Sequence, residues 1–594
     1  MSRNPLNVRL LSSMLMAGAL VFTGCNDNDY DFDQIDATVG IGGDGLEIPV
    51  SSTENIKLKD VLDLEEDGSV VEDASSHDYV FRQNGDPISP VVVNINKISV
   101  AKQHGESLPF TFNMPSAAKG HRRAYGSVTA DADIYQFTYE GDKPTEVVEL
   151  VSADASTTLS LNVPLHGISS VVSKLQTVEI ALPDYITFAT ANCSQTPTKV
   201  GSTLVFSDVP TSQNLKVNVN VTKLDFTKAG NEKNQIKVSG NKIHLKGTIH
   251  IKASGAITGT PTGTIDPVMA DFTMADFTIN TATGKFDPKI NLNEGLGSAR
   301  ITGIPDFLQD ENVKVDLYNP EILLTIGNDM EADGTIYGKI ISKKNGAVIN
   351  TINNVVIPVA GSTDNKVYEN KVCINRTGAA HAGYTVVAVP ELSKAIETIP
   401  DEITFEATAK ANSNKQITFQ LGHDYHITPA YSIDAPLAFA ENAEIVYKDT
   451  LDGWNDDLED LELADGTYIS ATAAVKNGIP AYLQVEAVPV GVAKTDGTRD
   501  IVDGIKIEFP DGKNKVAASE DGSTVKESPL EIKITQTKEG ALEKLDGIVF
   551  TASGTAKRDG APTVTGITLN AEKHTLKLDD IKIKIVGKVI GDFN

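Results

Sequence analysis

The chain contains little cysteine, few aromatic residues and few long apolar runs. Its 594 residues include three cysteines, one tryptophan and 6% aromatic residues. So few cysteines exclude a disulfide-dense scaffold and any cysteine-rich zinc site. The shortage of aromatic residues argues against a sugar-binding site, where carbohydrate rings stack on aromatic faces. Beyond the N-terminal segment, no stretch has the roughly 20 apolar residues that a transmembrane helix requires.

Positive charge and catalytic motifs are scarce as well. The formal net charge is −28, and a surface of that sign repels phosphate backbones, which excludes nucleic acid as a partner. The sequence has no G-x-S-x-G elbow, no P-loop, no H-E-x-x-H zinc motif and no glycine-rich dinucleotide turn. We therefore expect a protein that is not an enzyme and that holds no cofactor.

The N-terminal segment has the pattern of a secretory signal. Arg3 and Arg9 flank a stretch without acidic residues, and an apolar run follows from Leu10 to Val21. The run is too short to cross a bilayer. Its ending, Thr23-Gly24-Cys25, resembles the bacterial lipobox. That resemblance implies cleavage just before Cys25 and acylation of its thiol, so residues 1–24 are predicted to be a lipoprotein signal peptide.

An acidic run follows the predicted lipid site. Asp27, Asp29, Asp31 and Asp33 alternate with other residues. The run resembles the acidic export signal of Bacteroidota lipoproteins, and the stretch from Ile35 to Asp67 is similar to uncharacterised lipoproteins of that phylum. The resemblance implies a lipid-anchored protein on the outer face of the outer membrane and implies no activity. A solvated tether without any address function is the alternative.

Strand patterns dominate the rest of the chain. From Leu215 to Val221 apolar residues alternate with polar ones, and Leu224 continues the series one position out of register, which predicts a bulge near Lys223. Turn dipeptides such as Asn345-Gly346 are frequent, and long helical patterns are absent. Further alternation occurs at 313–317, 530–534 and 581–585. We predict an elongated all-β protein of tandem β-sandwich domains with a few short helices.

An internal duplication is also predicted. Short helices are expected at 168–178 and 392–399, leading into the similar sequences Pro183–Phe188 and Pro400–Phe405. A second pair of similar sequences, at 303–309 and 478–484, occurs in the same order. The predicted organisation is an acidic tether at 25–60, an N-terminal β domain at 61–160, and β-rich repeat units at 161–390 and 391–594.

One part of each repeat unit has a local family resemblance. Val315–Pro320 leads into a strand that ends at Asn328, and Val475–Pro480 leads into another strand. This arrangement is similar to the LEA-like (water-stress) β-sandwich. The resemblance implies a sandwich fold and no chemistry.

The densest cluster of charge lies between Asp449 and Asp465 and includes Trp454. We interpret it as a solvated acidic loop. A calcium-stabilised loop and a glycosidase-type carboxylate pair are the alternatives. The calcium ligands would be Asp452, Asp456, Asp457 and Asp460. Asp449-Thr450-Leu451 resembles the pattern at which Bacteroidota O-glycosylate exported proteins, which implies a glycan on Thr450.

Two cysteines remain after lipidation. Cys193 closely follows a predicted strand start, and Cys373 lies between Val372 and Ile374. Each can be buried as a small apolar residue, so we expect both to be unpaired and structural.

Taken together, these features favour a non-catalytic outer-membrane surface lipoprotein, a tandem β-domain module that serves as structure or binds an extracellular protein or glycan. A glycan-binding accessory lipoprotein of a nutrient-uptake system and a fimbrial subunit are the alternatives. The predicted site residues are Cys25 for lipidation and Thr450 for glycosylation; no catalytic residue and no resident metal are expected apart from the calcium alternative.

Overall fold

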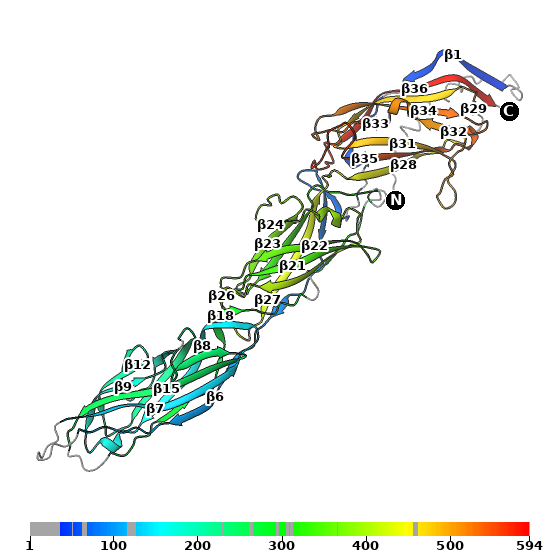
Figure 1. The fold of residues 1–594 in the computed structure, drawn as a ribbon. Helices are drawn as coiled ribbons and strands as arrows, with labels where there is room; N and C mark the ends of the chain where they lie inside the picture. Colours follow the sequence, from blue (N-terminus) through cyan, green and yellow to red (C-terminus); the bar gives the residue numbers. More distant parts are fainter. Residues whose placement is uncertain are drawn as a thin grey trace.

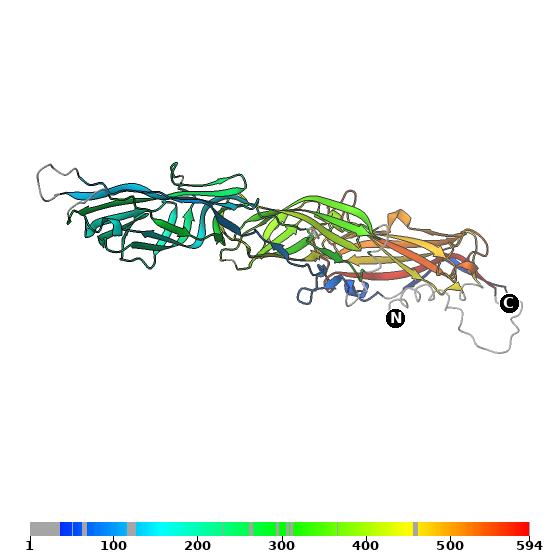
Figure 2. The same ribbon diagram turned by 90° about the horizontal axis from the view of Figure 1, so that it is seen from below.

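The computed structural model describes most of the chain from residue 36 onward. The described residues are 36–49, 52–61, 64, 68–115, 126–228, 230–259, 265–292, 296–304, 308, 313–364, 366–455 and 461–592. Within them the chain forms six β-sheets, paired into three sandwiches that lie in a row (Figures 1 and 2). The prediction of an elongated all-β protein with tandem sandwiches is confirmed.

The terminal sandwich contains the first and last described strands. Its larger sheet runs in the order β1 (Asp36–Pro49), β36 (Thr575–Asp592), β30 (Tyr468–Asn477), β34 (Lys526–Gln536) and β32 (Ile505–Glu508), with β2 (Ile56–Lys57) and β29 (Leu461–Leu463) also paired to β36. Its smaller sheet runs in the order β28 (Glu444–Leu451), β35 (Gly547–Thr555), β31 (Tyr482–Val490) and β33 (Lys515–Val516).

The middle sandwich follows along the row. Its larger sheet has the order β24 (Thr385–Ala388), β23 (Tyr368–Asn375), β20 (Glu321–Asn328), β27 (Tyr425–Pro436), β4 (Tyr79–Asn84) and β3 (Val70–Glu72), with β5 (Val91–Val93) also paired to β27. Its smaller sheet has the order β19 (Ser298–Arg300), β25 (Glu402–Ala411), β21 (Gly334–Lys344) and β22 (Ala347–Val359).

The distal sandwich lies at the far end of the row. One sheet has the order β11 (Thr198–Val200), β12 (Thr203–Pro210), β9 (Lys174–Ala181), β15 (Lys242–Ala256), β7 (Ser127–Asp142), β6 (Ile98–Ser107) and β17 (Phe277–Ile279), with β14 (Gln235–Ser239) paired to β15. The other has the order β10 (Ile186–Thr190), β13 (Leu215–Asp225), β8 (Val147–Val163), β18 (Thr281–Phe286) and β26 (Gln416–Gln420), with β16 (Asp271–Met274) paired to β8.

The chain visits the sandwiches in a nested order. It starts in the terminal sandwich with β1 and β2, contributes β3–β5 to the middle one, and then builds the distal one from β6 to β18. It then forms β19–β25 and β27 of the middle sandwich and completes the terminal sandwich with β28–β36. Between β25 and β27, the strand β26 joins a distal sheet. The chain therefore crosses the terminal–middle joint twice and the middle–distal joint four times, which limits how freely neighbouring sandwiches swing.

The three sandwiches share one topology. In each, an early strand pairs with the last long strand: β1 with β36, β4 with β27, and β7 with β15. In the terminal sandwich, β36 is followed across the sheet by β30 and then β34. The corresponding orders are β27–β20–β23 in the middle sandwich and β15–β9–β12 in the distal one. The opposing sheets contain β28–β35–β31, β19–β25–β21 and β8–β13–β10. The protein therefore has a threefold repeat of one sandwich.

This organisation differs from the one expected from sequence. The predicted boundary at 160/161 falls inside β8, the boundary at 390/391 falls inside the middle sandwich, and the 25–60 tether includes β1 and β2. The predicted twofold repeat is wrong, because its two similar sequences lie on strands that do not correspond. Phe188 lies on β10, whereas Phe405 lies on β25, and β25 corresponds to β13. The nested order is the reason, since each sandwich is assembled from segments far apart in the sequence.

The predicted short helices are mostly wrong. Only the 3₁₀ turn η2 (His166–Ile168) occupies the start of the first segment, and Leu175 and Val178 lie on β9 with their side chains buried. The second segment contains only the 3₁₀ turn η3 (Leu392–Ala395). Further helical elements within the described residues are α2 (Leu58–Val61), η4 (Pro510–Gly512) and η5 (Leu542–Lys544). Along the part of the chain that is described, no helix has the length and apolar character to cross a membrane.

Most strand predictions are confirmed, but the alternation at 313–317 forms only two isolated bridges, Lys314 with Glu444 and Leu317 with Phe439. β13 buries Leu215, Val217 and Val219 in turn, and its register with β8 shifts between Val221 and Lys223, as the predicted bulge requires. Asn345 and Gly346 have φ angles of 51° and 75°, the left-handed values that a two-residue hairpin turn between β21 and β22 demands.

Candidate functional site

The first described residues, which follow the predicted lipid site at Cys25, lie at the outer end of the terminal sandwich. Asp36 on β1 pairs with Asp592 on β36, while β36 begins at Thr575, close to the middle sandwich. The start of β1 is therefore at the end of the row farthest from the distal sandwich (Figure 1). Cys25 and the Asp27–Asp33 run lie outside the described residues.

The acidic cluster is partly described, and its described members already have partners. Asp452 forms an ion pair with Arg499, whose guanidinium also lies 2.6 Å from Asp546. Trp454 is 4% exposed in the apolar core of the terminal sandwich, so it offers no open face for a sugar ring. Asp456, Asp457 and Asp460 lie outside the described residues, so the calcium alternative remains a prediction.

Thr450, the predicted glycan site, lies on β28 opposite Val549 and is half-buried. Its backbone N–H donates to the Asp449 carboxylate at 2.8 Å. Glycosylation at this residue stays a prediction.

Both remaining cysteines are free thiols, as predicted. Cys193 is partly exposed, and its thiol lies 3.4 Å from the carbonyl oxygen of Asn218. Cys373 is fully buried on β23.

Three side chains of metal-ligand type meet around Cys373, on the outer face of the middle sandwich. Glu321 begins β20, and His381 lies in the loop formed by residues 376–384, between β23 and β24. One ligand atom from each residue lies within 4.8 Å of the other two, and His381 Nδ1 is 2.8 Å from Glu321 Oε2. We call Glu321, Cys373 and His381 the Cys–His–Glu cluster.

Strand register brings the first two members together. Glu321 pairs with Asn375 and Leu323 pairs with Cys373 across β20 and β23, so these four side chains share one face of the sheet. That face is the outer one, because the intervening Ile322 is buried in the core. Cys373 is nevertheless 0% exposed, and the 376–384 loop brings the His381 side chain within 4.8 Å of its thiol.

The loop is fixed to the strand by the buried side chain of Asn375. Its Nδ2 donates to the Ala379 carbonyl oxygen at 2.9 Å, and its Oδ1 accepts from the Gly378 N–H at 2.8 Å. Gly378 has a φ of 75°, a left-handed value at which a side chain would be strained. Asn375 thus holds the loop in the turn that returns His381 to the sheet.

Asn319 links the same loop to Glu321. Its Oδ1 accepts from the Thr377 N–H at 2.9 Å, and its Nδ2 donates to Glu321 Oε1 at 3.1 Å. The ion pair between Arg376 and the buried Asp316, at 2.9 Å, adds a third attachment. The cluster is therefore held in place by hydrogen bonds from several directions.

Chemically, the cluster does not resemble a nucleophilic site. Burial, together with the neighbouring Glu321 carboxylate, raises the pKa of the Cys373 thiol to about 11, so the group is a protonated thiol at neutral pH. A reactive cysteine instead needs an accessible thiolate.

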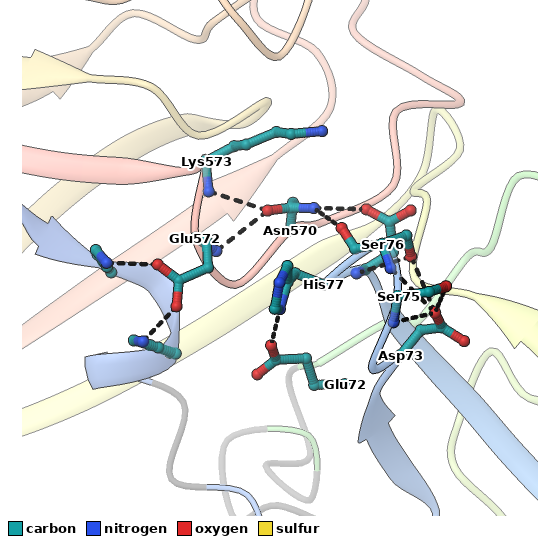
Figure 3. Close-up of polar contacts among 11 residues, drawn as sticks. Glu72, Asp73, Ser75, Ser76, His77, Asn570, Glu572 and Lys573 are labelled. Carbon is teal, nitrogen blue, oxygen red and sulfur yellow. Dashed lines mark hydrogen bonds and ion pairs between the residues drawn. The ribbon is translucent and has the colours of Figure 1, made fainter.

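The joint between the terminal and middle sandwiches contains a polar network centred on Asn570 (Figure 3). Asn570 is 2% exposed, and its Nδ2 donates to the Ser76 carbonyl oxygen at 2.9 Å and to Asp78 Oδ1 at 2.8 Å. Its Oδ1 accepts from the N–H groups of Glu572 and Lys573. One amide side chain thus satisfies groups on both sandwiches.

Charges and backbone bonds complete this joint. Glu572 forms ion pairs with Lys57 and Lys59, whose hydrogen bonds lower the pKa of its carboxyl group to about 2. The Tyr79 N–H donates to the Leu569 carbonyl oxygen at 2.8 Å, which joins the backbones of the two sandwiches directly.

The joint between the middle and distal sandwiches is apolar. β26, from the chain segment between β25 and β27, pairs with β18 of the distal sandwich. Phe419 of β26 lies 5.2 Å from Phe286 and 4.7 Å from Tyr425, measured between ring centroids. All three are buried, and one continuous apolar core runs through both sandwiches. The two sandwiches are therefore packed against each other as neighbouring domains with a shared core.

His574 makes the terminal–middle joint sensitive to pH. Its Nδ1 accepts from the Asn570 N–H at 3.0 Å, and burial lowers the pKa of the imidazole below its usual value of 6.5. The unfolded chain then binds a proton more readily than the folded one, so stability is highest above pH 6.5 and falls as the pH drops toward the lowered pKa.

We expect the free energy of unfolding of the terminal sandwich to fall on acidification below about pH 6.5. His574→Asn keeps an acceptor for the Asn570 N–H without titrating, so it should flatten that part of the profile. Denaturant unfolding across a pH series measures this, and an equally steep slope in both proteins would rule out His574 as the cause.

No protein-family model matches the chain, and no curated protein matches it. Among solved structures, a candidate secreted protein from Parabacteroides distasonis is 17% identical, with a TM-score of 0.34 over 50% of this chain and 82% of that one. The triple jelly roll fold of an archaeal virus turret is 11% identical, with a TM-score of 0.12 over 84% of this chain and 91% of that one. A candidate membrane-anchored protein from Corynebacterium diphtheriae is 11% identical, with a TM-score of 0.10 over 84% and 97%. Similarities this distant carry no functional argument.

Sequence reasoning missed the Cys–His–Glu cluster. The sequence pattern predicts Cys373 as an unpaired, buried residue and assigns no role to His381 or Glu321. A signal was present in the short spacing Cys373-x-Asn375-x₅-His381, which places a thiol, a turn-forming amide and an imidazole on one strand end and its loop. Only the register of β20 brings the third ligand, Glu321, to them.

Proposed function

We propose that the protein is a non-catalytic lipoprotein of the outer membrane, anchored through lipid on Cys25. Its row of sandwiches holds the distal sandwich away from the membrane to meet an extracellular protein or glycan. The observation that carries the proposal is the pairing of Asp36 with Asp592 at the outer end of the terminal sandwich. A chain attached shortly before Asp36 has the distal sandwich at its far end.

The two joints support a role in holding a domain at a distance. Each is crossed at least twice by the chain, and each buries specific contacts: the Asn570 network at one and the Phe419 packing at the other. A row of domains joined in this way resists bending better than domains connected by single flexible linkers.

The arrangement of the candidate residues supports a non-catalytic role. Trp454 lies in a core, Asp452 is paired with Arg499, and Cys373 is buried as a thiol. Neither Trp454 nor Cys373 presents a reactive group to solvent, and the exposed Asp452 carboxylate is paired with the Arg499 guanidinium.

The anchor can be tested by substitution. Cys25→Ala should release the protein from the membrane fraction, because lipid on this residue is the proposed attachment. Cys193→Ala, which removes a thiol from the distal sandwich, is the matched control and should leave the protein bound.

Intact cells test the orientation. External protease should degrade the wild-type protein without lysis. Protection in intact cells would contradict the surface position, and membrane retention of Cys25→Ala would contradict the lipid anchor.

A further inference from the structure

We propose that the Cys–His–Glu cluster of the middle sandwich binds a zinc ion. Glu321, Cys373 and His381 supply a carboxylate, a thiolate and an imidazole, which are the three ligand types that zinc accepts in proteins. This site lies outside the proposed anchoring and display function and does not depend on it.

The distances suit one ion. Zinc lies about 2.3 Å from sulfur and about 2.0–2.2 Å from nitrogen or oxygen ligands, so ligand atoms around it are roughly 3–4 Å apart. The three atoms of the cluster lie within 4.8 Å of one another, with His381 Nδ1 and Glu321 Oε2 at 2.8 Å. Small side-chain rotations are enough to bring all three onto a shared centre.

The donor set favours zinc over the hard cations. Calcium and magnesium prefer oxygen ligands, and calcium takes six to eight of them. One thiol, one imidazole and one carboxylate instead match the borderline-soft character of zinc.

The surroundings already hold the ligands in place. Asn319 donates to Glu321 Oε1 at 3.1 Å, which leaves Oε2 directed at His381. Asn375 Nδ2 lies 3.6 Å from Cys373 Sγ, and the Tyr384 ring packs edge-on against the His381 ring, with centroids 4.8 Å apart. Such partners orient metal ligands and strengthen binding.

Zinc binding has a simple proton balance. Cys373 forms the zinc–sulfur bond as a thiolate and releases its proton to solvent, while His381 binds as neutral imidazole. Three protein ligands leave a fourth position for water on the solvent side, where the His381 side chain is 31% exposed. The bound ion would fasten the 376–384 loop to β20 and so stabilise the folded state.

The test uses the purified mature chain in detergent, treated with a chelator and then dialysed against zinc. We expect one equivalent of protein-bound zinc by elemental analysis and a higher melting temperature with zinc than without it. Cobalt in place of zinc should give the intense near-ultraviolet absorption of a thiolate–cobalt bond.

Substitutions assign the site. Cys373→Ser, His381→Gln and Glu321→Gln should each weaken zinc binding, the first two by more than about 100-fold. Cys193→Ser is the matched control and should bind like wild type. His381→Gln changes a partly exposed loop residue, so its metal-free circular dichroism spectrum should match wild type and show that lost binding is not lost folding.

Three results would overturn the proposal. They are absence of bound zinc in the wild-type chain, equal binding by the Cys373→Ser and Cys193→Ser proteins, and a cobalt spectrum without thiolate absorption.

Discussion

Deleting residues 36–49 is expected to unfold the terminal sandwich, although most of that sandwich lies more than 400 positions later in the sequence. The deletion removes β1, whose ladder with β36 contains ten residue pairs. At a net 0.5–1.5 kcal/mol per hydrogen bond, the loss is on the order of 5 kcal/mol, comparable with the whole stability of a typical domain. It also exposes the edge of β36 to pairing with other chains.

Hydrogen exchange measures this effect strand by strand. Amides of β36 and β30 should lose protection, while those of β7 and β15 in the distal sandwich keep it. Glu47→Gln, which removes only an exposed ion pair with Lys582, is the control and should leave protection unchanged. Full protection of β36 in the deletion protein would mean that β1 is not part of the folded sandwich.

Phe419→Ala is expected to have the second large effect, at the joint between the middle and distal sandwiches. Phe419 is 1% exposed and packs on Phe286 and Tyr425, so its truncation leaves a cavity where the two sandwiches meet. Such substitutions cost about 3–5 kcal/mol. The β18–β26 pairing depends on the same contact and should open more often.

The matched control for the joint is Phe206→Ala. Phe206 is 0% exposed within the distal sandwich, so its loss should weaken that sandwich without loosening the joint. Small-angle scattering should report a smaller maximum dimension, from a bending rod, for Phe419→Ala, and exchange should rise in β26. Equal effects of both substitutions on β26 would show that Phe419 has no special role at the joint.

Regular alternation predicts several strands correctly, although the alternation at 313–317 forms only isolated bridges. Leu215–Val221 appears as β13 with its bulge, and the alternation at 530–534 and 581–585 lies on β34 and β36. These patterns report which face of a strand is buried, and that information is local. The helix predicted at 168–178 is wrong because its apolar residues serve two elements: Ile168 is buried in the 3₁₀ turn η2, and Leu175 and Val178 are buried on β9.

Strand partners were beyond the reach of the sequence. Nothing local in β1 indicates that it pairs with β36, and the nested order hides the repeat because each sandwich is split along the chain. The similar sequences were matched with the wrong partners. Pro183 follows β9 and Pro480 follows β30, and β9 and β30 are equivalent strands of the repeat. The Pro400–Phe405 sequence belongs to another strand of the repeat.

The same limit applies to the candidate site. Cys373 was predicted to be buried and unpaired, and both features are confirmed. Its neighbour Glu321 is fifty-two positions earlier and comes close only through the β20–β23 register. Sequence spacing alone therefore links Cys373 to His381 but not to the carboxylate.

Energy transfer to a membrane dye tests the central claim most directly. A fluorophore is attached in turn to Ile501→Cys, Val367→Cys and Val200→Cys, which replace exposed residues of the terminal, middle and distal sandwiches, in a lipid-anchored chain carrying Cys193→Ser. Cys373 is buried and should stay unlabelled, which the parent chain without the new cysteine checks. Transfer should decrease from Ile501 to Val367 to Val200, and equal transfer from the three positions or the reverse order would contradict the proposed orientation.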